Sequence, residues 1–377
     1  MTVRPSFDPG FSTDALTTLY APRSRVDALL RFEEALALAV ADAGLAPGDE
    51  AEATAAACRG GVDDPERILD STWETGTPVI ALRAAVEAGP WFHHGATTQD
   101  AIDTAQMILA GAALEILEGH LSAMAERLRD LTREHSHQPQ MGRTFLQDAR
   151  PTTFGFRTAT WLDAVLDHIV DVRYQRTRLV VQLGGPVGTG DAYGERGRAV
   201  IDTLAQRLGL RAPDVSWHTN RSGLLALAQA VERMARTMAK IGSDVALLAS
   251  SPIAEVAVRS GGSSSMPEKK NPIDSVRAVA AASACAGAAA MLTTAPPHQL
   301  DRAVGGWHVE WVALPLVFQT AGAAAEAMEQ CLDSLEVDAE AMGSHAGTNS
   351  LEAGFSQIDR VLAACDETLA HRPQRPR

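Results

Sequence analysis

Residues 261–272 combine residue types that suit proton transfer. They read Gly-Gly-Ser-Ser-Ser-Met-Pro-Glu-Lys-Lys-Asn-Pro, and their small side chains predict a loop that can adopt unusual backbone angles. Asn271 is a favoured helix N-cap and Pro272 suits the first helical position, so a helix is predicted to follow over residues 273–292. A serine, a lysine and a helix N-terminus together favour negative charge. A flexible linker is the alternative interpretation, but two of the chain's three lysines lie here.

Three segments, in order along the chain, carry a resemblance to a known family. Residues 93–100 read His-His-Gly-Ala-Thr-Thr-Gln-Asp, and residues 142–155 contain Gly-Arg-Thr-Phe-Leu-Gln-Asp-Ala followed by Pro-Thr-Thr-Phe-Gly. With the Gly-Ser-Ser-x-Met-Pro-x-Lys-x-Asn-Pro pattern of residues 262–272, they resemble the fumarase/aspartase (fumarate lyase) superfamily over about residues 11–351. Thr98 replaces the usual serine. Residues 182–188, 217–221 and 305–311 are most similar to the 3-carboxy-cis,cis-muconate cycloisomerase branch.

The resemblance implies a catalytic set within the loop. Ser263 matches the family's catalytic serine, and Lys269 and Asn271 match its ligands for substrate carboxylates. An isolated serine is too weak an acid to act near neutral pH, so its alkoxide needs Lys269, backbone N–H groups and the helix terminus nearby. No cofactor and no metal is expected. The resemblance implies substrate contacts for nine further residues: His93, Thr97, Thr98, Arg143, Thr144, Gln147, His218, Arg221 and Met266.

Several of these residues also fit purely structural roles. The polar side chains of residues 93–98 are what a loop that caps a helix at Asp100 would contain. Arg143 also fits an ordinary surface arginine. His218 and Arg221 stand where the next helix is expected to begin, and capping and substrate binding are both open for this pair.

Phe145 separates this chain from much of the superfamily. In members that act on fumarate, adenylosuccinate or argininosuccinate, a histidine follows the Arg-Thr pair and helps to protonate a poor leaving group. A carboxylate leaves without a proton, because its conjugate acid has a pKa of about 4. An apolar residue at this position therefore favours reactions with a good leaving group, such as lactone formation and its reverse.

Composition and periodicity predict an all-α protein. Alanine and leucine dominate and aromatic residues are 5% of the chain. The resemblance implies a three-part layout: an N-terminal helical domain over residues 1–99, a central bundle of long helices over 100–331, and a shortened C-terminal helical segment and tail over 332–377. Long helices are predicted over residues 100–135, 153–182 and 220–250. An a/d seam in the last of these comprises Leu224, Leu227, Val231, Met234, Met238, Ile241, Val245 and Leu248. We expect a homotetramer built on this bundle, with active sites shared between subunits.

The composition also restricts the partners. A net charge of −14 argues against nucleic acid or an acidic membrane surface, and it requires a locally basic pocket for an anionic substrate. No basic-then-apolar leader opens the chain, no uncharged apolar run reaches 18 residues, and the four cysteines are widely spaced. These features predict a soluble cytoplasmic protein that acts on a small polycarboxylate.

The branch resemblance implies cofactor-free conversion of 3-carboxy-cis,cis-muconate to 4-carboxymuconolactone, in protocatechuate breakdown through the beta-ketoadipate pathway. A lyase of the same branch that expels another good leaving group, such as nitrite from nitrosuccinate, is the alternative. A third possibility is a structural protein that has kept the fold. The intact set of Ser263, Lys269 and Asn271 argues against that possibility.

Overall fold

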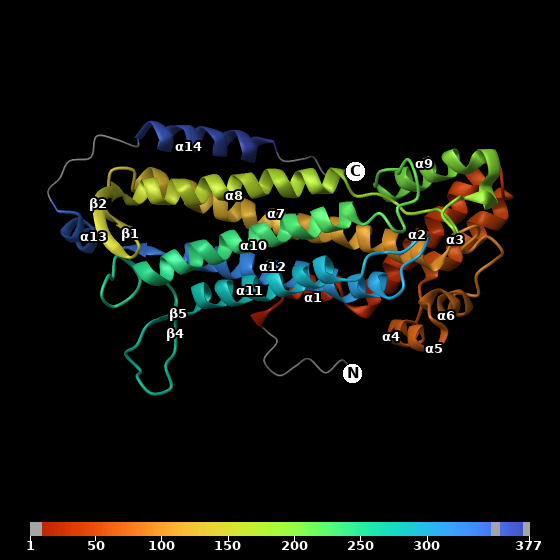
Figure 1. The fold of residues 1–377 in the computed structure, drawn as a ribbon, viewed down its shortest axis with the longest axis horizontal. Helices are drawn as coiled ribbons and strands as arrows, with labels where there is room; N and C mark the ends of the chain where they lie inside the picture. The colour runs from red at the N-terminus through yellow and green to blue at the C-terminus, as the bar shows by residue number, and fades with distance from the viewer. Residues whose placement is uncertain (1–9, 348–354, 372–377) are drawn as a thin grey trace.

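The computed structural model describes residues 10–347 and 355–371, which form an elongated, mostly helical molecule (Figure 1). Long helices run along its long axis and make the central bundle. They are α7 (Thr98–Glu134), α8 (Phe154–Thr177), α10 (Ser222–Leu248), α11 (Ile273–Thr294) and α12 (Gly306–Asp333). The predicted all-α fold with a bundle of long helices is confirmed.

The a/d seam of α10 is buried within one subunit. Its eight predicted residues are each at most 5% exposed. They are covered because α10 packs against α11, α12 and α8 of the same chain. The heptad pattern was correctly assigned to long partner helices, but those helices come from the same subunit. The seam therefore gives no reason by itself to expect a tetramer.

A different helix, α11, leaves an apolar face uncovered. It packs on α10 and α12, while its exposed positions recur every three or four residues: Ile273, Val276, Ala280, Ser283, Gly287 and Ala290. By length and composition, α7 and α11 could each cross a membrane, but their most apolar windows are 56% and 39% buried within the protein. A long apolar face of this kind is typical of a surface that packs against another chain.

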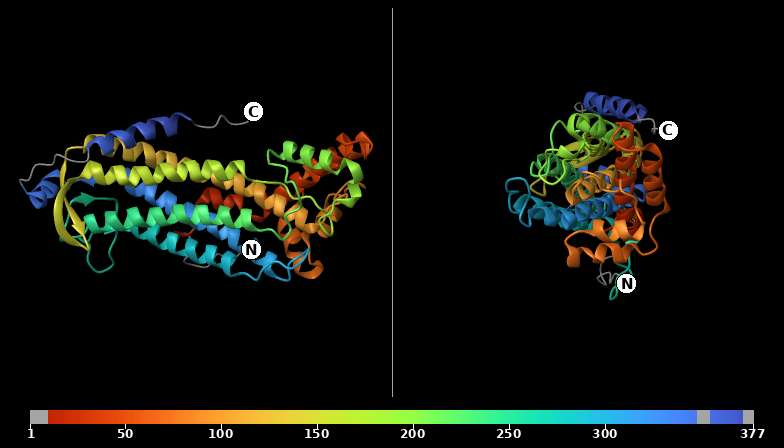
Figure 2. Two further views of the ribbon diagram at one scale, coloured as in Figure 1. Left: turned by 45° about the horizontal axis from the view of Figure 1, so that its top comes forward. Right: turned by 90° about the vertical axis from the view of Figure 1, so that its right-hand side faces the viewer.

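Helix α2 and most of the short helices gather at one end of the bundle, the short-helix end (Figures 1 and 2). One helix from the middle of the chain, α9 (Gly197–Leu208), joins them by packing on α2. A 3-10 helix (Asp191–Arg196) leads into α9. Helix α1 (Asp14–Leu19) lies further along the bundle, against α7 and α12 (Figure 1). The others are α2 (Pro22–Asp42), α3 (Gly48–Gly60), α4 (Pro65–Asp70), α5 (Thr72–Thr75) and α6 (Pro78–Ala85).

Three two-stranded sheets stand around the opposite end (Figure 1). The strands are β1 (Pro139–Thr144) with β2 (Gln147–Thr153), β3 (Val256–Ala257) with β6 (Glu336–Val337), and β4 (Ser260–Gly261) with β5 (Asn271–Pro272). The C-terminal segment adds α13 (Ala339–Ala346), which contacts β1, and α14 (Phe355–Ala370), which lies along α8. Residues 348–354 and the predicted tail beyond residue 371 lie outside the described residues.

The start of α11 differs from the prediction in one respect. Asn271 and Pro272 form β5, with Asn271 opposite Gly261, instead of the helix cap and first turn. The Asn271 side-chain amide donates to the carbonyl oxygen of Gly262 at 3.3 Å. This side chain therefore closes the base of the loop, and Pro272 takes the N-cap position before Ile273.

Candidate active site

Asp100 organises the first sequence block at the short-helix end. It is fully buried in the first turn of α7 and accepts hydrogen bonds from the backbone N–H groups of Thr97, Gly184 and Gly185 at 2.9, 3.0 and 2.8 Å. The Nε2 atom of His218 lies 2.7 Å from its Oδ1. One carboxylate thus caps the helix and fixes His218 and a neighbouring turn against it.

Asp103, one turn further along α7, holds Arg221. The guanidinium donates to both oxygens of Asp103 at 2.8 and 3.0 Å and also to both oxygens of Glu310. The indole N–H of Trp307 donates to Asp103 at 2.9 Å. Burial acts to lower the pKa of Arg221, but the charges of the two carboxylates outweigh it and raise that pKa. Arg221 is therefore a permanent cation paired with two buried acids of its own subunit.

His93 and Thr98 lie at the same end. The Nδ1 atom of His93 is 2.7 Å from Glu33 Oε1, and its backbone N–H donates to the other Glu33 oxygen at 2.8 Å. Burial acts to lower the pKa of His93, but the charge of Glu33 and their hydrogen bond outweigh it and raise that pKa. The Thr98 hydroxyl donates to Thr77 Oγ1 at 2.8 Å. The first block, residues 93–100, is thus a half-buried segment whose polar groups His93 and Thr98 are hydrogen-bonded within the protein.

Sequence reasoning missed the acids that hold this segment. The Thr97-x-x-Asp100 spacing was a usable signal, because it is a capping-box pattern. Asp103 follows on the same helix face, which is a weaker signal. The sequence contains no such signal for Glu33 or Glu310, because each lies far along the chain from its partner, His93 or Arg221.

Ser263 lies at the opposite end of the bundle, in the loop between β4 and β5 (Figure 1). Its Oγ accepts a hydrogen bond from the backbone N–H of Met266 at 3.1 Å. The backbone N–H of Lys269 donates to the Met266 carbonyl at 3.0 Å, so the loop turns back on itself. Within residues 10–347 and 355–371, the Lys269 ammonium makes no ion pair. The loop therefore holds a serine with one backbone donor already in place and an uncompensated cation nearby in sequence.

The β1–β2 hairpin carries the second sequence block beside this loop end. Arg143 donates to the buried Glu255 at 2.6 Å and to Asp148 at 3.2 Å. Thr144 and Gln147 are exposed and stand opposite each other, where the two strands meet the turn.

Phe145 and Leu146 form the two-residue turn of this hairpin, with φ angles of 52° and 61°. Such a turn usually takes asparagine or glycine, so two large apolar residues in it are strained. The Phe145 side chain is 99% exposed in the single subunit. An apolar side chain displayed in this way is placed to meet another surface.

A basic cleft of about 500 Å³ lies beside the hairpin. Arg143, Arg150 and Arg157 line it together with Thr144. Arg143 is already paired with Glu255 and Asp148, whereas Arg150 and Arg157 make no ion pair within the described residues. In a protein of net charge −14, these two arginines give the cleft the local basic character that an anionic substrate requires.

The predicted site residues fall into two groups that one subunit does not bring together. The 27 residues of α10 alone separate Arg221 from the segment leading to Ser263, which is about 40 Å at 1.5 Å per residue. At the short-helix end lie His93, Thr97, Thr98, His218 and Arg221. At the opposite end lie Arg143, Thr144, Gln147, Ser263, Met266, Lys269 and Asn271.

Within the described ranges, no group of three or more His, Cys, Asp and Glu side chains is arranged to hold a metal ion. The four cysteines, Cys58, Cys285, Cys331 and Cys365, are buried and unpaired.

Comparisons with known proteins agree with one another. Residues 10–287 match a protein family described as lyase. The 3-carboxy-cis,cis-muconate cycloisomerase of Pseudomonas aeruginosa is 37% identical over 90% of this chain and 77% of that protein. The nitrosuccinate lyase of Streptomyces davaonensis is 33% identical over 91% of this chain and 76% of that protein. The crystal structure of 3-carboxy-cis,cis-muconate lactonizing enzyme from Pseudomonas putida superposes with a TM-score of 0.85 at 30% identity, covering 97% and 88% of the two chains.

Proposed function

The chain belongs to the fumarate lyase superfamily of enzymes, and on this premise we propose that it is a cofactor-free cycloisomerase that converts 3-carboxy-cis,cis-muconate to 4-carboxymuconolactone. The observation that carries the proposal is the 37% identity to the Pseudomonas aeruginosa cycloisomerase over 90% of the chain. Phe145 supports it, because an apolar residue in place of a histidine acid suits a carboxylate leaving group. The free, buried cysteines favour a reducing cytoplasm.

Ser263 is the proton donor in this proposal. One substrate carboxylate adds through its oxygen to a double bond, and the π electrons of that bond take the Ser263 proton at the carbon next to another carboxylate. The Ser263 alkoxide then recovers a proton from water. The lactone has one carboxylate fewer than the acyclic acid, so each turnover consumes one proton from the solvent.

Positive charge and backbone donors would make this step feasible. The Met266 N–H already donates to Ser263 Oγ, and a donor aimed at an oxygen stabilises the alkoxide more than the hydroxyl. Lys269 is free to bind a substrate carboxylate, and Arg150 and Arg157 of the basic cleft add further cations. Each charge-assisted contact of this kind contributes about 1.5–3 kcal/mol.

We further propose a homotetramer in which different subunits supply the two groups of site residues. The separation of about 40 Å along α10 supports sharing, because no local movement of a single chain would join the groups. The exposed apolar face of α11 supports assembly, as does the exposed Phe145 beside the second block. Closed homo-oligomers bury such faces against copies of the same chain.

The decisive assay follows the ultraviolet absorbance of the conjugated diene with purified protein and no added metal, together with a pH indicator. We expect the absorbance of 3-carboxy-cis,cis-muconate to decay with one proton consumed per molecule. cis,cis-Muconate, which lacks the 3-carboxylate, should bind measurably less well, and fumarate, adenylosuccinate and argininosuccinate should show negligible turnover. No decay with the tri-acid, alongside turnover of an amine-releasing substrate, would overturn the proposal.

Nitrosuccinate cleavage is the second candidate. It is favoured by the 33% identity to the Streptomyces davaonensis nitrosuccinate lyase, and nitrite is also a good leaving group. Incubation with nitrosuccinate and colorimetric detection of nitrite distinguishes the two. Nitrite release at a higher kcat/KM than diene loss would replace the cycloisomerase proposal. The Ser263 alkoxide would then act as a base that removes the proton next to a substrate carboxylate as nitrite leaves.

A further inference from the structure

The basic cleft beside the β1–β2 hairpin contains one arginine that is held in place without being neutralised. Arg157, near the start of α8, lines this cleft and is half-buried. Its Nε atom donates to the side-chain oxygen of Gln140 at 2.6 Å. An amide is a neutral acceptor, so this hydrogen bond fixes the plane of the guanidinium and leaves its positive charge available.

The other two nitrogens of Arg157 are open to solvent. Among the described residues, Nη1 and Nη2 of Arg157 make no hydrogen bond or ion pair, and neither belongs to the buried side-chain atoms that lack a partner. Both atoms are therefore accessible. Because Nε is occupied, a bound carboxylate would meet the end of the guanidinium, with one oxygen on each Nη atom.

A buried chain of hydrogen bonds holds Gln140 in the orientation that Arg157 needs. Gln140 is fully buried, and its amide group donates to Glu255 at 2.8 Å. Reversing the amide would set its NH₂ group against the guanidinium and its oxygen against the carboxylate, so the two charged neighbours fix its orientation. Glu255 is itself fully buried and accepts hydrogen bonds from both Nη atoms of Arg143, at 2.6 and 3.2 Å.

Arg143 is engaged by protein acids at all three of its nitrogens, since its Nε donates to Asp148 at 3.2 Å and its Nη atoms to Glu255. The two arginines thus differ in what they offer a ligand. Arg143 is neutralised by its own subunit, whereas Arg157 keeps a free end and an uncompensated charge.

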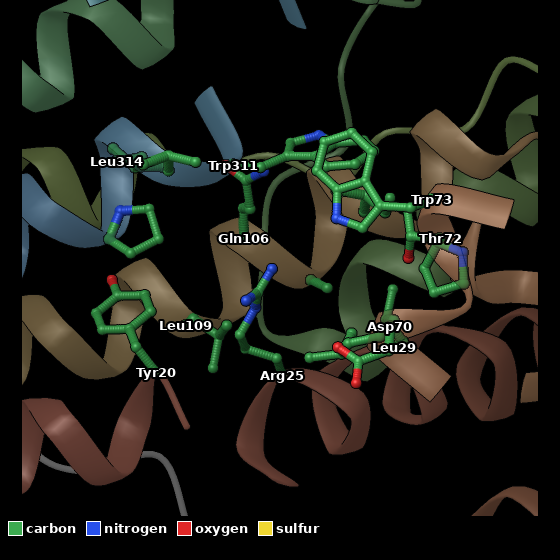
Figure 3. A pocket seen from close by; sticks show the side chains of 16 residues that line it. Tyr20, Arg25, Leu29, Asp70, Thr72, Trp73, Gln106, Leu109, Trp311 and Leu314 are labelled. Carbon is green, nitrogen blue, oxygen red and sulfur yellow. The ribbon is translucent and has the colours of Figure 1, made fainter. Parts of the chain in front are cut away.

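Arg25, at the short-helix end, is half-buried too but lacks this support. It lies in a cavity of about 290 Å³ between α2, α7 and α12, and in the part of the chain that the structure describes its guanidinium makes no hydrogen bond or ion pair. Figure 3 places it between Tyr20 and Trp73, in a cavity whose walls are mostly apolar. Burial lowers the pKa of both Arg25 and Arg157, as expected for cations that are partly shielded from water. Only Arg157 combines a fixed guanidinium with a second cation, Arg150, on the same cleft.

We propose that Arg157 binds a carboxylate of the polycarboxylate substrate through Nη1 and Nη2, and that Gln140 and Glu255 are the positioning residues for this contact. The inference rests on the proposed function, under which an anionic substrate reacts at this end of the bundle. Arg150 is exposed on the same cleft, so it can bind a second carboxylate. Two cations on one cleft suit a polyanion better than a monocarboxylate.

Isothermal titration calorimetry of the full-length protein with tricarballylate, a saturated tricarboxylate without a double bond to react, tests the contact apart from turnover. We expect one molecule bound per chain and a loss of affinity of about ten- to a hundredfold in Arg157→Gln. Arg25→Gln removes the other half-buried arginine without an ion pair and is the matched control, which should bind as the wild type does. No binding at millimolar tricarballylate, undiminished binding in Arg157→Gln, or an equal loss in Arg25→Gln would overturn the proposal.

Kinetics with 3-carboxy-cis,cis-muconate connect this contact with the reaction. Tricarballylate should inhibit competitively. Arg157→Gln should raise KM by about ten- to a hundredfold with little change in kcat, because a contact made equally to bound substrate and transition state affects binding alone. Noncompetitive inhibition, or a fall in kcat with unchanged KM, would show that Arg157 does not bind substrate. If the wild type leaves the muconate unchanged but binds tricarballylate through Arg157, the cycloisomerase proposal fails and the carboxylate site stands.

Gln140→Met tests the positioning role, because methionine has a similar length but bonds neither the guanidinium nor the carboxylate. We expect it to weaken tricarballylate binding severalfold and to raise KM with little change in kcat. The double variant Gln140→Met/Arg157→Gln should bind no more weakly than Arg157→Gln alone, because Gln140 acts through Arg157. Losses that add in the double variant would show that Gln140 does not position Arg157.

Arg157→Lys keeps the test valid if Arg157→Gln fails to fold. It retains the positive charge at this position, so it should fold. Its affinity for tricarballylate should still fall severalfold, because one ammonium group cannot hold Gln140 and also bind both oxygens of a carboxylate as a planar guanidinium does. Undiminished binding in Arg157→Lys would overturn the proposed geometry.

Discussion

The two ends of the bundle hold their functional residues in opposite ways. At the short-helix end, Asp100, Asp103 and Arg221 are buried and joined by short hydrogen bonds across three helices and a turn. At the loop end, Ser263 makes one backbone contact, and the Lys269 ammonium makes no ion pair within the described ranges. The polar groups at the short-helix end are therefore fixed in place, whereas Ser263 and Lys269 at the loop end are restrained by few contacts.

This difference suits binding of substrate at the short-helix end and proton transfer at the loop end. Glu33 and Thr77 hold His93 and Thr98, two of the predicted substrate contacts, in fixed positions, which is what preorganised binding needs. A proton donor must instead approach its carbon as substrate binds, and a loop rich in glycine and serine suits that. Because these contacts and the donor lie at opposite ends of one chain, assembly is what would unite them.

The largest effect should come from the loop end. Ser263→Ala removes the proposed proton donor, and proton-transfer groups contribute about 10²–10⁴-fold in rate. We expect a loss of kcat near the upper end of that range with an unchanged melting temperature, because Ser263 is not in the core. Ser265→Ala, two residues along the same loop, is the control and should retain wild-type turnover. If Ser263→Ala keeps more than about a tenth of wild-type turnover, the assignment of Ser263 is wrong.

Mixing two inactive variants tests whether the two ends meet between subunits. Thr98→Asp places a negative charge in the first block, where it repels an anionic substrate yet suits the N-terminus of α7. Thr98→Asp and Ser263→Ala should each be inactive alone. Co-expressed in equal amounts, they should recover about a quarter of wild-type activity, since random assortment leaves that fraction of shared sites intact. No recovery in verified mixed oligomers would mean that each site is built from one chain.

Matched Asp→Asn changes compare the stability of the two ends. Asp103→Asn weakens a buried pair with Arg221, and breaking such a pair costs about 3–5 kcal/mol in the free energy of unfolding. Asp148→Asn removes a partner of Arg143 that is 67% exposed, and exposed pairs contribute about 0–1 kcal/mol. Urea denaturation followed by circular dichroism measures both. Equal losses of unfolding free energy in the two variants would show that the buried ion pair at the short-helix end contributes no more stability than the exposed pair at the loop end.

The sequence predicted the long helices well because their apolar periodicity and Gly/Pro breaks are local signals. The α10 seam is buried as its spacing implied, and α11 begins at Ile273. The Asn271 cap was wrong, since a strand pairing with Gly261 competed for the same residues, and such pairing is not visible in local propensity. The motifs marked the candidate site residues. They could not reveal Glu33 or Glu310, whose partners are set only by the tertiary fold.

The smallest expected effect concerns His93 at the short-helix end. Its pKa is raised in the folded protein, so its pairing with Glu33 stabilises fully below the unfolded pKa of about 6.5 and is lost as pH rises through the folded value. His93→Asn removes this dependence, and asparagine tolerates the positive φ of 57° at this position. Relative to the variant, the wild type should lose no more than about 1 kcal/mol of unfolding free energy as pH rises above 6.5.

His168 on α8 supplies a control of opposite sign. Burial lowers the pKa of His168, so the unfolded state binds the extra proton, and this residue destabilises the protein as pH falls through about 6.5. His168→Gln should therefore reduce the loss of stability on acidification, whereas His93→Asn should increase it. Urea midpoints measured between pH 5.5 and 8.5 give both slopes. If the urea midpoints of the two variants depend on pH in the same way, Glu33 does not hold His93 in its charged form. The ion pair between His93 and Glu33 would then not contribute to the stability of the short-helix end.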